Sequence, residues 1–366
     1  MSSRPNSGKQ FAGLEIARFL CALAVMFWHY QVFFVNGVVT DHDLPAVPVE
    51  KFPFYLIFSF FYNNGHFAVQ IFWMISGFIF LWKYSKPINE GMVSAYQFFV
   101  LRFSRLYPLH FVTLIAVALL QLTYIETHGT SFVFGNTDAF HFALQLVFAS
   151  NWVNELPQTF NGPIWSVSVE VMVYVFFLIV VSFLKPSLVL CVAVAVAAKA
   201  ASHFYPQYVF ECIQYFFVGG ALQAVGARLS RRYKLVAFGL CVLGLCLSIA
   251  TSFRFGSIIG FSFFVVASFA LLDEVMPVRR SAVTKVGDLT YASYLLHFPI
   301  QLATVLAIDA MGFTRELFLA PWALIAFFLA TFGLAWIVFR VFEMPAQDAL
   351  RTAWLGRRKR VAATTA

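Results

Sequence analysis

The stretch Phe11–Phe34 reads FAGLEIARFLCALAVMFWHYQVFF, and it decides how the rest of the chain is interpreted. It is long enough to cross a bilayer, which takes ~20 mostly apolar residues. Arg18 and His29 interrupt it about three helical turns apart, ~16 Å along the axis, so both project from one helical face. An ionisable residue in a membrane helix usually faces a protein interior, which makes both side chains functional candidates. The alternative is an arginine that snorkels to one interface and a histidine that lies at the other.

The composition indicates the same class of protein. The chain has 366 residues, of which 61% are hydrophobic and only 11% are charged, whereas soluble domains carry about 25% charged residues. We therefore predict an all-α, polytopic membrane helix bundle that forms one domain over 1–366, with no appended soluble domain. The net charge of +8 does not indicate a nucleic-acid partner, because basic residues in short loops and tails orient a chain in the lipid bilayer.

Ten apolar runs are long enough to be predicted as membrane spans. They are 11–34, 66–83, 107–124, 163–184, 187–204, 207–227, 235–252, 255–276, 288–309 and 318–341. The semi-apolar stretch 140–153 is shorter and is predicted to be interfacial or re-entrant. If it crossed the membrane, the basic cluster Arg228–Lys234 would lie opposite the other basic loops, against the positive-inside rule. Ten spans instead place both the lead 1–10 and the basic tail 352–366 in the cytosol.

Two arginines mark the inner end of the third predicted span. Arg102 and Arg105 are three residues apart and so present on one helical face. Guanidinium groups bind phosphates bidentately, which suits a phosphate-bearing ligand. Plain orienting charge in contact with lipid phosphates is the alternative. Glu343, at the inner interface after the last span, is a candidate ion-pair partner for either arginine.

The fourth predicted span carries a carboxylate inside the membrane. Ser166 and Glu170 are four residues apart on one face, and Tyr174 extends the row. A buried carboxylate needs a partner, and His29 at similar depth is the natural one. Bonding of Glu170 to neighbouring hydroxyls, purely for packing, is the alternative. In the ninth span, the lone histidine His297 can equally be a satisfied structural residue.

The sequence predicts no metal site and no bound cofactor. The five cysteines lie in apolar runs without a C-x-x-C pair, so neither a disulfide framework nor a metal site is indicated. The cluster Asp41–Asp43 has metal-ligand residue types, but it lacks a second half. The glycines of the sixth predicted span, Gly219, Gly220 and Gly226, predict close packing between helices.

Several short motifs, taken in order, resemble the acyltransferase type 3 family of bacterial O-antigen and exopolysaccharide O-acetylases. They are the pair Arg18 and His29, ISGF (75–78), RFSRLYP (102–108), GPIWSVSVE (162–170), FFVGG (216–220), SYLLH (293–297) and FEMP (342–345). Each motif is short, but the ordered combination is specific and covers nearly the whole chain.

The resemblance implies transfer of an acyl group, usually acetyl, from cytosolic acyl-CoA to a carbohydrate hydroxyl. Acetyl-CoA is then a co-substrate, and a bacterial inner membrane is the implied location. The resemblance makes Arg18 and His29 essential and associates Arg102 and Arg105 with the acyl-CoA side. Its remaining motifs add the site candidates Trp165, Ser166, Ser168, Glu170, Tyr294 and His297.

A mechanism can be stated as a hypothesis. His29, held and polarised by Glu170, acts as general base on the acceptor hydroxyl. Arg18 serves the donor side, because ~16 Å along a straight helix separates it from His29. A covalent acyl-enzyme through Ser166 or His29 stays open.

Three other interpretations remain open at this point. A saccharide or solute carrier would line its path with the same ionisable residues. A succinyl donor, or a cytosolic small-molecule acceptor such as a macrolide, would keep the enzyme but change a substrate. The loops Asn36–Gly65 and 125–162 are expected to set acceptor specificity, because loops carry such variation.

Overall fold

The structure is a computed structural model that describes residues 11–39, 47–154, 158–251, 258–275 and 280–365. It is 82% helical, and no strand occurs in these ranges. The helices are α1 (Ala12–Trp28), α2 (Tyr55–Asn64), α3 (Ala68–Phe80), α4 (Lys86–Asn89), α5 (Ala95–His128), α6 (Ala139–Leu146), α7 (Ile164–Phe183), α8 (Leu188–Phe204), α9 (Tyr208–Gly226), α10 (Arg231–Ala250), α11 (Ile258–Val275), α12 (Arg280–Ala310), α13 (Pro321–Val338) and α14 (Met344–Thr365). The prediction of an all-α polytopic bundle is confirmed.

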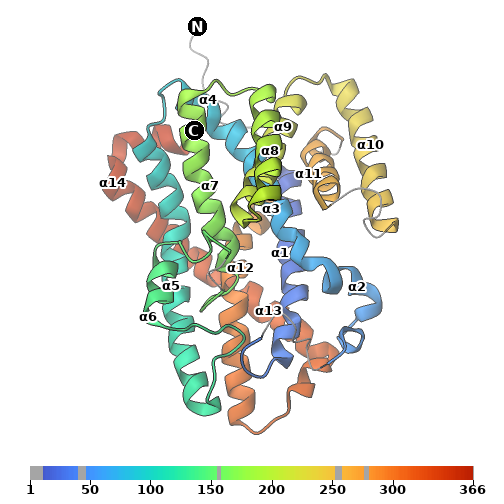
Figure 1. Cartoon of the computed structure of the whole chain (residues 1–366), viewed down its shortest axis with the longest axis vertical. Helices are drawn as coiled ribbons and strands as arrows, with labels where there is room; N and C mark the ends of the chain where they lie inside the picture. The colour runs from blue at the N-terminus through green and yellow to red at the C-terminus, as the bar shows by residue number, and fades with distance from the viewer. Residues whose placement is uncertain (1–10, 40–46, 155–157, 252–257, 276–279, 366) are drawn as a thin grey trace.

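Nine helical stretches of the described chain are long and apolar enough to cross a membrane. Nine of the ten predicted spans fall within them. The tenth, 187–204, is α8, whose 17 residues make it shorter than the other nine. Figure 1 shows α8 beside α9, running from the α7 connection toward the middle of the bundle.

Two of the long stretches contain a π-helix. The five residues Leu81–Ser85 (η4) form a π-helix between α3 and α4. A second π-helix, Phe339–Glu343 (η6), joins α13 to α14. Such π-segments are rare and occur frequently at functional sites.

The stretch 140–153 does not cross the bundle. It contains α6, which has only eight residues. His110 Nε2 lies 2.7 Å from the carbonyl oxygen of Gln145, and Gln145 Nε2 donates to the carbonyl of Thr159. Asp138 caps the helix, and hydrogen bonds from the backbone and ring of His141 hold the pKa of Asp138 below its ordinary value. The prediction of a non-spanning segment is confirmed.

The basic connections gather at one end of the bundle. α1 and α5 begin at this end, and the loops after α7 and α9 lie there too, at the top of Figure 1. These loops carry Lys185 and the cluster Arg228–Lys234. We call this the basic end. The end of the bundle at which α5 and α12 finish is called the opposite end. The lead 1–10 lies outside the described residues, and the predicted tail 352–366 is largely part of α14.

Buried apolar side chains form two clusters, one toward each end. The cluster at the basic end includes Val25 of α1 and Leu296 of α12. The cluster at the opposite end includes Met26 and Phe298 of the same two helices. The boundary between the clusters therefore crosses α1 and α12 at the level of His29 and His297.

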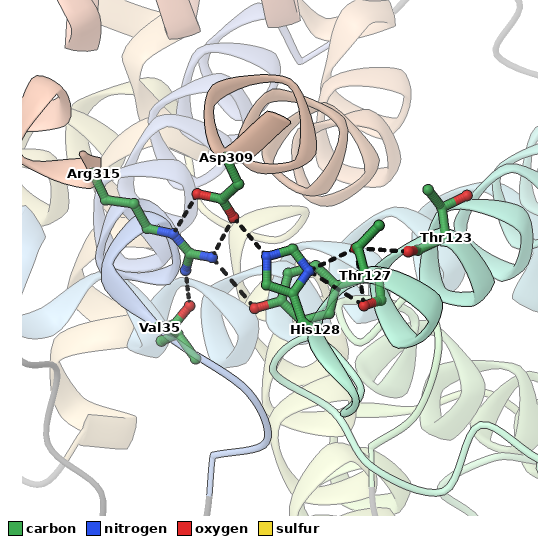
Figure 2. Close-up of polar contacts among 7 residues, drawn as sticks. Val35, Thr123, Thr127, His128, Asp309 and Arg315 are labelled. Atoms are coloured by element: carbon green, nitrogen blue, oxygen red, sulfur yellow. Dashed lines mark hydrogen bonds and ion pairs between the residues drawn. The ribbon is translucent and has the colours of Figure 1, made fainter. Parts of the chain in front are cut away.

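An ion-pair cluster ties helix ends together at the opposite end (Figure 2). Arg315 Nη2 donates to Asp309 Oδ2 at 2.7 Å, and Nη1 donates to the carbonyl of Val35. His128 Nε2 lies 3.1 Å from the same carboxylate oxygen of Asp309. Burial alone would lower the pKa of Arg315, but hydrogen bonds to Asp309 and Tyr124 outweigh it and raise that pKa above its ordinary value. The charged guanidinium therefore joins the ends of α1, α5 and α12.

Glycines let α3 and α9 approach closely. A Cβ atom added at Gly77 of α3 would overlap the carbonyl oxygen of Phe216 in α9. One added at Gly219 of α9 would overlap the carbonyl oxygen of Met74 in α3. Small residues at such crossings bring helix backbones together. The packing role predicted for Gly219 is thus observed. The same prediction for Gly226 is wrong, because no heavy atom lies within 4 Å of a Cβ added there.

We expect Gly219→Ala to destabilise the protein by about 1–3 kcal/mol, because the added methyl must push two backbones apart. Thermal unfolding of purified protein in detergent measures the loss as a lower Tm. Gly226→Ala is the matched control, since it lies on the same helix with no heavy atom within 4 Å of the added Cβ. Equal Tm values for the two variants would contradict the close α3–α9 contact.

Candidate functional site

A cavity of ≈ 320 Å³ lies between α1, α3, α5, α7 and α12 in the basic half of the bundle. Six of its lining residues are of the charged types Glu, Lys and Arg. They are Glu15, Arg18, Lys83, Arg102, Arg105 and Glu170. Four are basic and two are acidic, so the cavity has an excess of positive charge and suits an anionic ligand.

The predicted arginine pair lines this cavity. Arg102 Nη2 donates to the hydroxyl of Tyr84 at 2.6 Å, and its guanidinium lies 5.0 Å from the ring centroids of Phe80 and Tyr84. Tyr84 belongs to the π-helix η4, which was not predicted from the sequence. Arg105 lines the same cavity three residues later. The spacing argument for one shared face is confirmed.

Arg18 also faces the cavity. Its Nη1 lies 3.6 Å from Oε2 of Glu15, the residue one turn earlier on α1. Both side chains line the cavity and both remain about a quarter exposed. Arg18 therefore lies among the basic residues of the cavity, as the donor-side prediction requires.

The expected pairing of Glu170 with His29 is wrong. Glu170 lines the cavity and bonds to the hydroxyls of Ser76 and Tyr174. Similar depth in the membrane fixes the height of two residues but not the direction in which each helix turns them. The alternative of bonding to neighbouring hydroxyls describes Glu170 correctly, although its carboxylate faces a cavity and is not packed in a core.

Ser166 and Tyr294 close the end of the cavity that lies toward the middle of the bundle. Their hydroxyl oxygens are 2.8 Å apart, and the Tyr294 hydroxyl also donates to the carbonyl of Pro163 at 2.9 Å. Both residues line the cavity. The turn at Pro163 starts α7 here, which brings the predicted Ser166 against α12.

Two further predicted residues of α7 lie outside this cavity. Ser168 is fully buried and donates to the carbonyl of Phe148 at 2.7 Å. Trp165 packs edge-on against Trp73 and contacts the ring of Tyr208. Ser168 thus has a structural role, and Trp165 supports the wall of the cavity through Trp73.

His29 pairs with His297. The Nδ1 atom of His29 lies 2.9 Å from Nε2 of His297, and the two residues are 268 positions apart in the chain. The α-helical winding of α1 ends at Trp28, and His29 begins the 3-10 segment η1 (His29–Phe34). Gln301 Nε2 donates to the carbonyl of His29 at 2.7 Å and so holds this change of winding. The pair therefore links α1 to α12.

Gln301 was not among the site residues predicted from the sequence. It lies four residues after His297, on the same face of α12, and it is fully buried. That spacing within SYLLHFPIQ was the available signal. This spacing identifies Gln301 as a partner of His29 only when α1 is known to pack against α12.

The histidine pair adjoins the cavity but does not line it. Tyr294, which does line it, is one turn before His297, and their ring centroids are 5.9 Å apart. A chain of contacts therefore runs from the cavity through Tyr294 to His297 and His29. The ring of Tyr294 therefore lies between the positively charged cavity and the histidine pair, which supplies the candidate general base.

The described residues hold no group of three metal-ligating side chains. The cluster Asp41–Asp43 lies outside the described residues. Glu343, in the π-helix η6, is buried, and it lies near Tyr291, as Arg105 does. The predicted ion pair of Glu343 with an arginine stays a prediction.

A family model described as an acyltransferase domain matches residues 11–340, nearly the whole chain. The chain belongs to the acyltransferase type 3 family. No curated protein and no solved structure matched the chain in the other two comparisons. The match includes every predicted site residue, whereas Glu343 and α14 follow it.

Membership of this acyltransferase family gives the geometry a chemical meaning. An acyltransferase must hold a donor and an acceptor and must remove one proton from the acceptor nucleophile. The basic cavity can hold an anionic substrate, and the adjoining histidine pair can take the proton. The residues for both tasks come from segments that the fold brings together: α1, α3, α5, α7, α12 and the π-helix η4.

We expect Ser76→Cys to react with an anionic methanethiosulfonate reagent about tenfold faster than with a cationic one, because a cleft of one charge sign concentrates oppositely charged ions. The five native cysteines would first be replaced. Ser168→Cys is the matched control, since Ser168 is buried outside the cavity and should not react. Equal rates for both reagents at position 76 would contradict the positive cavity.

Proposed function

We propose that this acyltransferase moves an acetyl group from acetyl-CoA to a hydroxyl of a cell-surface polysaccharide or of its lipid-linked precursor. The observation that carries the proposal is the basic cavity ending at Ser166 and Tyr294, one turn from the pair His29–His297. A phosphate-bearing thioester fits the first part and an acceptor hydroxyl needs the second. The proposed location is a bacterial inner membrane with the basic end in the cytosol.

The donor half of the proposal rests on charge and on reach. Arg102, Arg105 and Lys83 can bind phosphate oxygens, and arginine does so bidentately. The pantetheine arm is long and unbranched, so it can extend along the cavity toward Ser166 and Tyr294. Arg18 lines the same cavity and lies close enough to Glu170 to interact electrostatically, so it can neutralise charge that develops on the thioester oxygen.

The acceptor half rests on the histidine pair. Because Nδ1 of His29 bonds to Nε2 of His297, the other ring nitrogen of His29, Nε2, is the one that can take a proton. This requires the tautomer in which Nδ1 of His29 carries hydrogen and Nε2 of His297 accepts it. His297 is then a positioning residue that fixes the ring and stabilises its protonated form, as the third member of a catalytic triad does.

The proposed reaction is a single acyl transfer. Nε2 of His29 takes the proton of the acceptor hydroxyl as its oxygen attacks the thioester carbonyl carbon. The carbon–sulfur bond breaks, and the imidazolium returns the proton to the leaving CoA thiolate. Glu170 lines the donor cavity and is not beside His29. We therefore assign it to the donor side, where its carboxylate, bonded to two hydroxyls, helps to fix the cavity wall.

We expect His29→Ala to lower transfer about 10²–10⁴-fold, which is the range for loss of a general base. Membranes that contain the variant are incubated with radiolabelled acetyl-CoA, and label in polysaccharide is counted. His203→Ala is the control, because His203 is exposed on α8, and it should transfer as the wild type does. Full activity of His29→Ala would contradict the assignment, and an inactive wild type would contradict the acetyl donor.

For a positioning residue, the effect of His297→Gln should fall on kcat and leave the KM for acetyl-CoA unchanged. We expect kcat to drop about 10–100-fold, with a larger drop in His297→Ala, because glutamine keeps a hydrogen-bonding group near His29. Steady-state kinetics of purified protein in nanodiscs measures both constants. A raised KM with normal kcat would instead place His297 in donor binding.

A further inference from the structure

The last helix packs on the helix that carries the predicted arginine pair. Figure 1 shows α14 beside the first half of α5, at the left of the basic end. The Trp354 ring of α14 stacks on Phe103 of α5, with centroids 5.4 Å apart. The Tyr96 hydroxyl donates to the Trp354 carbonyl at 3.3 Å. α14 is therefore held at the level where the basic cavity begins, although it follows the residues that the family model matches.

These contacts bring a third arginine to the predicted pair. Arg351 of α14 is half-buried, and its Nε donates to the hydroxyl of Ser104 at 3.0 Å. Ser104 lies between Arg102 and Arg105 in the chain. Arg351 is close enough to both of them, and to Tyr84, to interact electrostatically. Arg351 directly precedes the predicted basic tail 352–366, and no role was predicted for it from the sequence.

Three guanidinium groups in one half-buried place repel one another unless an anion joins them. The acidic group near Arg351 is Asp348, one turn earlier on α14. Nε of Arg102 is buried without a hydrogen-bond partner in the described structure. A ligand with several phosphate oxygens would relieve the repulsion, since each guanidinium can donate two parallel hydrogen bonds to it.

We propose that Arg351 joins Arg102 and Arg105 in a site for the phosphates of the nucleotide part of the acyl-CoA donor. This inference rests on the proposed function and deepens it. The nucleotide binds between α14 and α5 at the basic end, and the pantetheine arm enters the cavity. α14 thereby sets a preference for CoA thioesters over thioesters that lack the nucleotide.

Lipid headgroups present the same phosphate chemistry at this depth, so the test must separate the two sources. Acetyl-CoA and acetyl-pantetheine carry the same thioester, but acetyl-pantetheine has no phosphate. For Arg351→Gln we expect kcat/KM with acetyl-CoA to fall about tenfold or more, because a charged hydrogen-bonded pair is lost. With acetyl-pantetheine it should stay within about twofold of the wild-type value.

The control is Arg340→Gln, which removes the same charge from the same helical stretch. Arg340 is exposed and stacks on Trp336, 5.1 Å from its ring centroid. It should leave both donors unaffected. Arg351→Lys tests geometry: it keeps the charge but not the two-pronged hydrogen bonding, so it should lose part of the acetyl-CoA activity.

A binding measurement keeps the test independent of turnover. Adenosine 3′,5′-bisphosphate keeps the 3′-phosphate and one of the two 5′-phosphates of CoA and has no pantetheine arm. It should bind the wild type in nanodiscs and bind Arg351→Gln about tenfold more weakly. Equal losses with both acetyl donors, or unchanged nucleotide binding, would overturn the assignment. So would a loss that appears only in nanodiscs with anionic lipid. A wild type that uses neither donor would contradict the proposed function itself.

Discussion

The hydrogen bond between His29 and His297 joins the two helices on which the rest of the site depends. It links α1 to α12 at 2.9 Å, at the level where the two apolar clusters of the bundle meet. α1 changes from α-helical to 3-10 winding at His29, and Gln301 holds the new backbone direction. Buried polar groups must find partners in a membrane interior. The pair therefore restricts how α1 and α12 can lie, and it leaves one histidine nitrogen for chemistry.

The two halves of the bundle differ in their contents. The basic half holds a cavity with an excess of arginine and lysine. One π-helix supplies Tyr84 to its lining, and the other supplies Glu343, which lies near the lining residue Tyr291. The opposite half is filled by aromatic side chains and closed by the ion pairs around Arg315 and Asp309. An anionic donor is thus favoured at one end only. The histidine pair lies at the boundary, which is where an acyl group that enters from the basic end would meet an acceptor.

Much of the fold could be predicted because membrane spans follow from local composition. Nine spans, the short segment at 140–153 and the shared face of Arg102 and Arg105 depend only on length, hydropathy and helical spacing. α8 is the ambiguous case, because its 17 residues lie at the lower limit for a span.

The partners of individual residues could not be predicted in the same way. His29 meets a residue 268 positions away, and a single sequence carries no record of which helices are neighbours. Glu170 was paired with His29 by depth, but rotation of α7 turns it toward Ser76 and the donor cavity. The π-helices at Leu81–Ser85 and Phe339–Glu343 depend on tertiary packing, since their residues are ordinary helix residues.

The most direct test of the account is a cryo-electron-microscopy structure of the protein in nanodiscs with a thioether analogue of acetyl-CoA, which cannot transfer its acyl group. The account predicts density for the phosphates at Arg102 and Arg105 and for the acyl end beside Ser166 and Tyr294, next to the pair His29–His297. Ligand density at the opposite end, or an acyl end separated from Tyr294 by a closed wall, would contradict it.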